Sequence, residues 1–302
     1  MTIEQLEAYQ LIEKRAINEL KSTGYYLKHK KTGAKVCLLS NEDNNKVFYI
    51  GFRTPAPDDT GVPHILEHSV LCGSKEFPVK DPFVELAKGS LNTFLNAMTY
   101  PDKTVYPVAS CNERDFQNLI HVYMDAVFYP NIYEKEEIFR QEGWHYELES
   151  EDAPLTLNGV VYNEMKGAFS SPEGVLEREI LNSLYPDTTY ANESGGDPEA
   201  IPTLKYSEFL DFHSRYYHPS NSYIYLYGDC DMAEKLDWIE KNYLSRYDCL
   251  PVDSEVRTQK HFTETREVVR EYSVSAEEGT EDKTYLSYNK SVGDTMDKKL
   301  CL

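Results

Sequence analysis

The chain has 302 residues, of which 40% are hydrophobic, and its 31 Lys and Arg against 51 Asp and Glu give a formal net charge of −20. This composition is typical of a globular protein, and the acidic balance argues against nucleic-acid binding, which needs a basic surface. No stretch approaches the roughly 18 consecutive apolar residues of a membrane-spanning helix. The six cysteines are scattered and the first residues lack a basic-then-apolar leader, so we expect a cytoplasmic protein with reduced thiols.

The first part of the chain predicts one helix followed by short strands. Apolar residues recur at loosely helical spacing over residues 4–21, which predicts a polar helix. Beyond it the hydrophobic period becomes that of strands, with turn residues between them. The expected strands, which would form an antiparallel meander, are residues 25–29, 34–39 and 47–52. A loop then leads to a helix that should begin near Pro63 and end near Leu71.

Strands and helices then alternate in mixed order. A short helix is expected over residues 81–88, with Asp81 as its N-cap and Pro82 at the first helical position. The further strands expected are residues 94–99, 104–108 and 222–227. The further helices expected are residues 112–128, 134–147, 160–169, 173–184, 207–217 and 232–244. This mixed order indicates an α+β fold in which a mostly antiparallel sheet packs against helices.

Composition divides the chain into three parts. Residues 1–250 hold nearly all the expected elements and would form one domain. Residues 251–283 are rich in Glu, Thr and Arg with few large apolar side chains, which predicts a linker or an edge segment. Residues 284–302 would begin a second, truncated domain, with a strand at residues 284–288.

The motif His64-Ile65-Leu66-Glu67-His68 indicates a metal site. Histidines four positions apart lie about one turn apart on one helix face, so both imidazoles can reach a single ion. The order H-x-x-E-H inverts the more familiar H-E-x-x-H and is typical of a class of metallopeptidases. Glu67 would lie beside the ion and be free to act on a bound water. Two ligands do not complete a zinc site, so the chain must supply a third.

Several residues are candidates for the third ligand. Each candidate histidine is more easily explained as an ordinary surface or core residue than as a ligand. These histidines are His29, His121, His145, His213 and His218. Catalytic zinc bound by two histidines is often completed by a carboxylate. Glu164 stands out because it is the lone carboxylate in an apolar-flanked helix start at residues 159–167, although acidic residues are too abundant for spacing alone to choose.

The chain resembles the insulinase-type, pitrilysin-like zinc peptidases, and most closely their presequence protease branch. The motif and the residues that follow it, 64–74, carry the resemblance together with other segments. Those other segments are residues 91–104, 159–167, 195–198 and 217–221. The resemblance implies that His64, His68 and Glu164 bind one zinc ion per chain. It also implies that Glu67 is the general base that activates a zinc-bound water.

The resemblance further implies a zinc-dependent endopeptidase or oligopeptidase domain that hydrolyses unstructured peptides. An edge strand near the zinc could bind an extended peptide through backbone hydrogen bonds. The resemblance implies this role for the region of Asn96 and Ala97, within an expected strand over residues 93–98. The candidate substrate-binding residues are Phe94, Leu95, Asn96, Ala97 and Met98. An ordinary interior strand remains the alternative.

Proteases of the branch that this chain resembles are much longer, with four related domains in two halves that close around the peptide. The resemblance therefore implies that residues 1–250 are an N-terminal zinc-binding catalytic domain. Its implied partners are peptide substrates and the C-terminal half of the same protease, and the isolated chain would bind zinc but cleave poorly. Two alternatives remain open. One is a non-proteolytic peptide-binding or scaffold relative, and the other is a non-peptidase H-x-x-E-H metal lyase.

Overall fold

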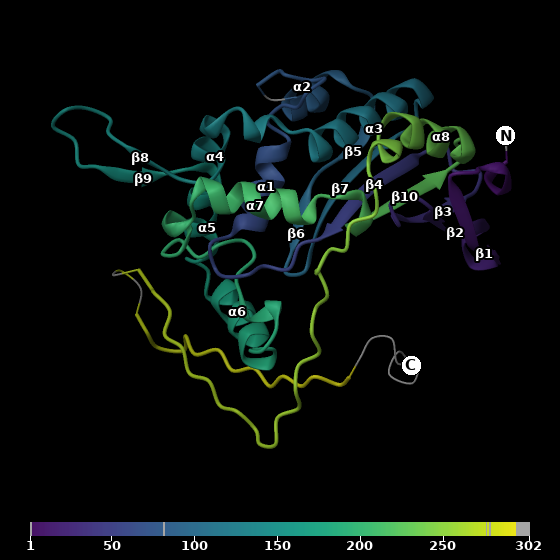
Figure 1. Ribbon diagram of the computed structural model, residues 1–302. Helices are drawn as coiled ribbons and strands as arrows, with labels where there is room; N and C mark the ends of the chain where they lie inside the picture. The colour runs from purple at the N-terminus through teal and green to yellow at the C-terminus, as the bar shows by residue number, and fades with distance from the viewer. Residues whose placement is uncertain (1, 81, 276, 278, 294–302) are drawn as a thin grey trace.

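An 8-stranded sheet lies at the centre of the fold in the computed structural model, which describes residues 2–80, 82–275, 277 and 279–293 (Figure 1). The strand order is β1-β2-β3-β10-β4-β7-β5, and β6 also pairs with β7. Neighbouring strands are antiparallel except β3 and β10, which are parallel. The strands are β1 (Tyr9–Ile17), β2 (Ser22–His29), β3 (Lys35–Ser40), β4 (Lys46–Arg53), β5 (Asn92–Leu95), β6 (Met98–Tyr100), β7 (Lys103–Ser110) and β10 (Ser222–Gly228).

Most of the helices cover one face of this sheet and enclose the hydrophobic core, whereas the helix over residues 172–184 extends away from the sheet and has no buried residue (Figure 1). The helices are α1 (Val62–Val70), α2 (Pro82–Gly89), α3 (Glu113–Phe128), α4 (Glu136–Glu142), α5 (Val160–Ala168), α6 (Pro172–Leu184), α7 (Tyr206–Tyr216) and α8 (Met232–Asn242). Alternate sheet residues such as Phe48, Ile50 and Val108 are fully buried in the core. On the opposite face of the sheet Tyr49 and Tyr225 are only partly buried and stack with ring centroids 5.0 Å apart. The predicted α+β fold is therefore confirmed.

The helix predicted for residues 4–21 is wrong. Half of those residues form β1, which pairs with β2 from Tyr9↔His29 to Ile17↔Ser22, and short 3-10 helices lie before and after it. The apolar residues were only loosely helical in spacing, and most of β1 is exposed, so no apolar helix face exists to bury. Pairing with β2 instead satisfies the backbone, and Lys14 lies 5.1 Å from the centroid of the Tyr25 ring on β2.

The predicted meander is correct for β2 and β3 but wrong for β3 and β4. Strand β10 lies between them, with Tyr225 opposite Cys37 on β3 and opposite Tyr49 on β4. Inserting β10 buries Ile224 and Leu226 and satisfies the inner edges of both neighbours. Local turn signals could not reveal this pairing, because β10 comes from a distant part of the sequence.

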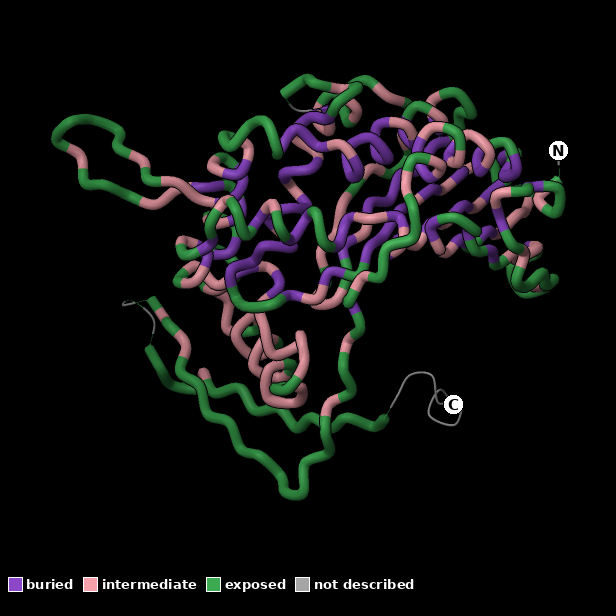
Figure 2. The backbone as a smooth tube through the Cα atoms, in the orientation of Figure 1, coloured by how far each residue is buried: buried purple, intermediate pink, exposed green. Residues whose placement is uncertain are grey.

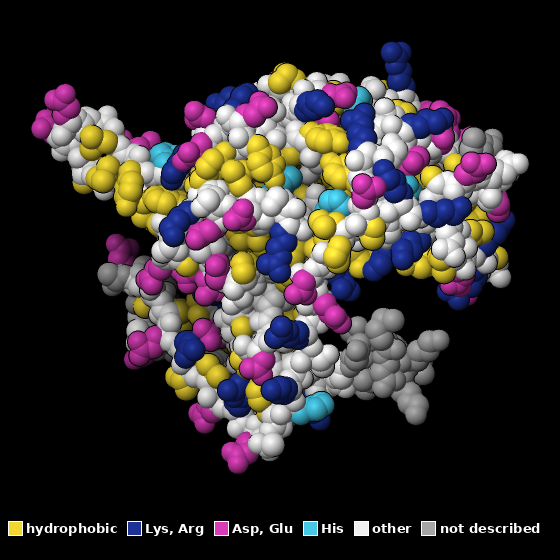
Figure 3. All heavy atoms as spheres, in the orientation of Figure 1, with side chains coloured by type: hydrophobic (Ala, Val, Ile, Leu, Met, Phe, Trp, Pro, Cys, Tyr) yellow, Lys and Arg dark blue, Asp and Glu magenta, His cyan; other side chains and the backbone are white. Residues whose placement is uncertain are grey.

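The helix predicted for residues 134–147 is also wrong in its second half. Helix α4 ends at Glu142, and β8 (His145–Glu147) then pairs with β9 (Thr156–Asn158) in a hairpin that projects from the body (Figure 1). A Cβ on Gly143 would lie 2.8 Å from the Phe139 carbonyl oxygen and 3.2 Å from Ile65 Cγ2, so α4 stops at a close approach to α1. Figure 3 shows hydrophobic side chains along this hairpin, which carries the exposed residues Tyr146, Leu148 and Leu155.

Residues 251–293, where described, contain no helix or strand, and most of their side chains are exposed (Figure 2). The segment runs past α6, to which Arg270 is joined by an ion pair of 2.9 Å with Glu179. The strand predicted at residues 284–288 is therefore wrong, because no neighbouring strand supplies backbone hydrogen bonds. The predicted N-cap Asp81 and residues 294–302 lie outside the described residues, and the three-part domain division stays a prediction. None of the described helices combines the length and apolar character needed to span a bilayer.

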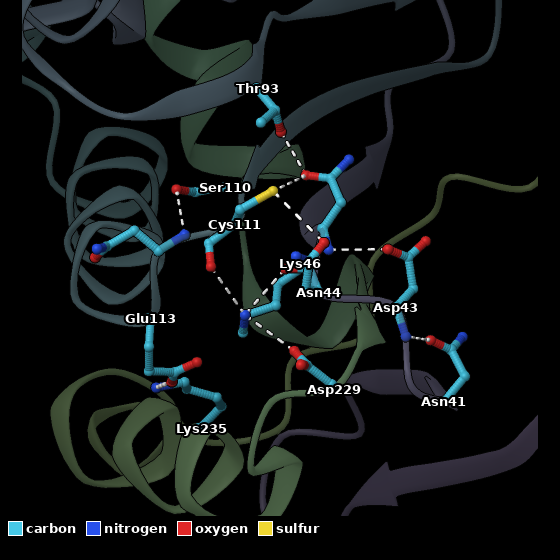
Figure 4. Close-up of polar contacts among 12 residues, drawn as sticks. Asn41, Asp43, Asn44, Lys46, Thr93, Ser110, Cys111, Glu113, Asp229 and Lys235 are labelled. Atoms are coloured by element: carbon cyan, nitrogen blue, oxygen red, sulfur yellow. Dashed lines mark hydrogen bonds and ion pairs between the residues drawn. The ribbon is translucent and has the colours of Figure 1, made fainter.

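A buried lysine joins three segments at one end of the sheet (Figure 4). Lys46 donates hydrogen bonds to the carbonyl oxygens of Asn44 and Cys111, at 3.0 and 3.2 Å, and pairs with Asp229 at 2.9 Å. Nearby, Glu113 at the start of α3 pairs with Lys235 of α8 at 2.5 Å. These contacts fix α3 against β4, β10 and α8, and α3 in turn packs on β7.

Candidate metal centre

Helix α1 presents its two histidines on the face away from the core. Gly61 precedes it with φ of +68°, and Pro63 stands in the first turn, where its missing N–H needs no partner. Ile65, Leu66 and Val70 are buried against the sheet and neighbouring helices. The 3.6-residue repeat therefore places His64 and His68 together on the opposite side.

Helix α5 brings Glu164 to these histidines. Val161 and Met165 are the buried residues of α5, while the Glu164 side chain is 51% exposed. Gly159 starts the helix with φ of +157°, and a Cβ there would lie 2.1 Å from the Gly143 carbonyl oxygen. This close approach of the chain after α4 places α5 beside α1.

Three donor atoms converge between the two helices. Glu164 Oε2 lies 3.5 Å from His64 Nε2 and 3.6 Å from His68 Nε2. All three donor atoms lie within 4.8 Å of one another, and no other such cluster occurs in the part of the chain that the structure describes. These separations exceed those of ordinary hydrogen bonds. A tetrahedral ion with bonds of about 2.0 to 2.2 Å separates its ligand atoms by about 3.3 to 3.6 Å, and the two distances to Glu164 agree with this range.

The other ring nitrogen of each histidine has its own partner. His64 Nδ1 donates to the Gly195 carbonyl oxygen at 3.0 Å, and His68 Nδ1 donates to Glu142 Oε2 at 3.3 Å. With Nδ1 protonated, a neutral imidazole turns the lone pair of Nε2 towards Glu164. The lone pairs on Nε2 of His64, on Nε2 of His68 and on the Glu164 carboxylate then face one another. They repel unless a proton or a cation lies between them.

Charge and burial tune the groups around His68. Desolvation opposes protonation of its ring, but the hydrogen bond with Glu142 and the charges of Glu67, Glu164 and Glu142 outweigh it and raise the pKa of His68. Burial works against ionisation of Glu142, yet its hydrogen bonds with His68, Gln141 and Cys72 lower its pKa. The site therefore attracts a positive charge.

Glu67 lies on the inner side of α1, and its residue is only 9% exposed. Its Oε2 accepts a hydrogen bond of 2.7 Å from the Thr99 hydroxyl on β6. The buried rings of Tyr106, Tyr123 and Tyr217 lie close enough for the Glu67 charge to add to desolvation in raising the pKa of each phenol. Glu67 directly precedes His68 in α1, and its role as a general base beside a bound ion stays a prediction.

The strand predicted over residues 94–99 is interrupted, because β5 ends at Leu95 and β6 begins at Met98. Strand β5 is the terminal strand of the sheet, so the expected edge position is confirmed. Between the two strands, Asn96 donates its N–H to the Pro107 carbonyl oxygen at 3.2 Å, and its own carbonyl accepts from Tyr123 at 3.2 Å. The Phe94 side chain is exposed, whereas Leu95, Ala97 and Met98 are half-buried.

The other candidate histidines lie outside the cluster of donor atoms. His29 is buried and pairs with Glu240 at 2.6 Å, and His121 pairs with Glu76 at 3.0 Å. His213 is buried between α7 and α3, while His145 lies in the β8–β9 hairpin and not in a helix. His218 begins the turn before β10.

Sequence reasoning missed three partners in the site, namely Glu142, Gly195 and Thr99. Glu142 is one of many acidic residues, and its distance from the motif along the chain carries no signal. Gly195 belongs to a segment that carries the family resemblance. Its contact uses the backbone carbonyl, which every residue has, so the residue type does not indicate this role. Thr99 follows the candidate substrate strand directly, and its pairing with Glu67 requires the tertiary structure.

Two family models match the sequence. The model of the insulinase family, peptidase family M16, matches residues 47–193, and the model described as the peptidase M16 inactive domain matches residues 203–299. Among relatives, Protein HypA of Clostridium perfringens is 55% identical over 289 residues, which are 96% of this chain and 30% of that protein. Presequence protease 1, chloroplastic/mitochondrial, of Arabidopsis thaliana is 49% identical over 283 residues, 93% of this chain and 26% of that protein.

Solved structures share the fold. The crystal structure of pitrilysin aligns with a TM-score of 0.62 at 17% identity, over 82% of this chain and 25% of that chain. A protease from Helicobacter pylori aligns with a TM-score of 0.60 at 19% identity, over 78% of this chain and 53% of that chain. The fold is therefore that of the pitrilysin-type proteases. The chain belongs to the insulinase family, peptidase family M16.

Proposed function

We propose that this chain is a zinc-dependent endopeptidase or oligopeptidase domain that hydrolyses unstructured peptides. The observation that carries the proposal is the convergence of His64 Nε2, His68 Nε2 and a Glu164 oxygen, with Glu67 in the same helix as the two histidines. Two imidazoles and one carboxylate are a donor set typical of catalytic zinc, with a fourth position left for water or substrate. Membership of peptidase family M16 supports the same chemistry.

Zinc bound there would supply a Lewis acid that polarises a peptide carbonyl and lowers the pKa of water. The protein residues would orient the zinc ligands and transfer the proton. The Nδ1 contacts of His64 and His68 fix the two imidazole rings in orientation. Glu67 accepts the proton of the attacking water and then passes it to the leaving amine. The Thr99 hydroxyl already occupies Glu67 Oε2, so the second carboxylate oxygen is the one free to exchange that proton.

The edge of the sheet offers a surface for the peptide. We propose that an extended substrate pairs with the backbone of the sheet edge near Asn96 and Ala97. Because the Asn96 N–H already donates to the Pro107 carbonyl, the neighbouring backbone groups would supply the donors to the peptide. Strand β6 contacts α1 through the hydrogen bond of Thr99 with Glu67, so a peptide on this edge lies beside the donor cluster. Phe94 of β5 and Met98 of β6 would contact side chains of the peptide.

The chain spans about a third or less of the curated relatives described above, at 30% of the Clostridium protein and 26% of the Arabidopsis protein. We propose that the rest of such a longer protein is the partner of this domain and completes the active site around the peptide. The isolated chain would then bind zinc but cleave slowly. Its cytoplasmic location stays a prediction.

A single substitution tests the proposed chemistry. Glu67→Gln keeps the size of the side chain but removes its ability to accept a proton, so zinc should still bind while peptide cleavage falls by about a hundredfold or more. The measurements are zinc content and cleavage of a fluorogenic unstructured peptide, with the wild type as reference. A scaffold relative would show no zinc-dependent cleavage in the wild type, and full cleavage by Glu67→Gln would contradict the proposal.

A further inference from the structure

The further inference concerns a hydroxyl beside the proposed base, and it rests on the proposed function. Thr99 lies in β6, 32 positions after Glu67, and its Oγ1 donates a hydrogen bond of 2.7 Å to Glu67 Oε2. We propose that Thr99 is a positioning residue, which holds the Glu67 carboxylate in the orientation needed for proton transfer.

The direction of this hydrogen bond follows from the chemistry of its partners. An ionised carboxylate can only accept, so the hydroxyl must donate. A charge-assisted hydrogen bond of this length is among the stronger ones in proteins. It fixes one oxygen of Glu67 and therefore the rotation of the whole carboxylate, which leaves the other oxygen with a defined position.

Thr99 is held by the pairing of β6 with β7. In the β6–β7 pair Thr99 lies directly opposite Thr104, so both side chains project from the same face of the sheet. Thr104 is buried, and its hydroxyl shares a hydrogen bond of 2.8 Å with Thr54. Tyr106 and Tyr217, whose hydroxyls lie 2.7 Å apart, are buried in the adjoining layer. The hydroxyl that holds Glu67 is therefore part of the sheet and not of a loop.

Position matters more than presence for a general base. A base must come within about 2.6 to 3.2 Å of the proton that it accepts. A displacement of about 1 Å in an active site can lower the rate by about a hundredfold. Because β6 also adjoins the proposed peptide-binding edge, Thr99 connects the strand beside the substrate to the base that acts on it.

Substitutions at this position separate positioning from ordinary strand structure. Thr99→Val keeps the branched shape and the strand propensity but removes the hydroxyl, whereas Thr99→Ser keeps the hydroxyl and removes the methyl group. For zinc-loaded protein we expect Thr99→Val to lower kcat about ten- to a hundredfold with KM nearly unchanged, and Thr99→Ser to recover most of the loss. Thr23→Val is the control, because it removes a hydroxyl from β2, several strands away from β6 in the sheet, and should leave kcat unchanged.

Crystal structures of the metal-free variants give a readout that does not depend on activity. Glu67 should keep one carboxylate orientation in the wild type and in Thr99→Ser, and should rotate away from it in Thr99→Val. The proposal is overturned if Glu67 stays in place in Thr99→Val, or if Thr99→Ser and Thr99→Val lose kcat equally. Absence of cleavage by the zinc-loaded wild type, with Glu67 still released in Thr99→Val, would reject the proposed function and retain the positioning role.

Discussion

At the scale of single residues, the two histidines differ in what holds them. His64 is fixed by a backbone carbonyl of the loop at Gly195, and His68 by the carboxylate of Glu142 at the end of α4. A carboxylate partner increases the basicity of an imidazole more than a carbonyl does, so His68 should be the stronger donor of the pair. Glu142 is in turn held by the Gln141 amide at 2.8 Å.

Removing Glu142 tests this support. We expect Glu142→Ala to weaken zinc binding about ten- to a hundredfold, because the His68 ring loses its orientation and part of its basicity. Glu137→Ala is the matched control, since it removes an exposed carboxylate from the same helix. Competition with a chelator measures both affinities. Equal zinc affinity in the two variants would mean that Glu142 does not support His68.

The sequence is informative about the site where one local pattern carries the chemistry. His64, Glu67 and His68 follow from helical geometry, and the short helix with Glu164 supplies a third candidate. Glu142 and Thr99 could not be found in this way, because their roles depend on which segments pack against α1. Tertiary contacts between distant residues leave no periodic signal in a single sequence.

At the scale of elements, the start of α1 depends on a close contact between Gly61 and the segment that holds Gly195 and Gly196. A Cβ on Gly61 would lie 2.6 Å from Gly196 Cα and 2.7 Å from the Gly195 carbonyl oxygen. That same carbonyl accepts the hydrogen bond from His64 Nδ1. The close approach therefore joins the N-terminus of α1 to the carbonyl group that orients His64.

Gly61→Ala should disturb both features. Its positive φ is costly for alanine, and the new methyl group would displace the Gly195 loop, so we expect the free energy of unfolding to fall by about 2 kcal/mol or more. Zinc affinity should fall with it. Gly167→Ala is the control, because its Cβ enters open space in α5 and should be neutral or stabilising. Denaturant unfolding measures both, and equal stability of the two variants would contradict the expectation.

A buried histidine joins α7 to α3. His213 Nε2 donates to the Val127 carbonyl oxygen at 3.0 Å, and its Nδ1 accepts from the Tyr133 hydroxyl at 2.8 Å. Desolvation lowers the pKa of His213 to about 4, although the hydrogen bond with Val127 opposes the shift. The folded protein therefore binds this proton far less readily than the unfolded chain does.

The low pKa of His213 predicts a loss of stability in acid. The contribution is fully present above about pH 6.5 and is lost as the pH falls to about 4, because only the unfolded chain gains the proton in that range. The expected loss is on the order of 3 kcal/mol. The side chain in His213→Gln cannot take up a proton in this range. The difference in free energy of unfolding between this variant and the wild type should therefore become smaller as the pH falls. Parallel pH profiles of unfolding free energy would rule out this role of His213.

Elements were predicted best where burial and period agree. The strongly amphipathic pattern of α3 gives the helix within one residue of its observed start, and Asn112 caps it through the Asp115 N–H. The helices predicted over β1 and β8 are wrong, because only one residue of β1 and none of β8 is buried, so no core imposes a period on these segments. Whether such a segment forms a strand or a helix depends on whether a neighbouring strand is available to pair with it.

At the scale of the whole molecule, the two halves of the sheet are joined by β10, which comes from the later part of the sequence. Strand β10 joins the half built from β1, β2 and β3 to the half built from β4, β7 and β5. The α+β class could be predicted from the order of elements, but this central position could not. The model described as the peptidase M16 inactive domain includes β10 and matches as far as residue 299.

The central claim is that His64, His68 and Glu164 hold one zinc ion in each chain. Measurement of zinc per chain by elemental analysis, after saturation and dialysis, tests it most directly. We predict one zinc per chain for the wild type and for Glu67→Gln, and a near-complete loss for Glu164→Ala. Retention of one tightly bound zinc by Glu164→Ala would contradict the account, because it would remove Glu164 as the third ligand.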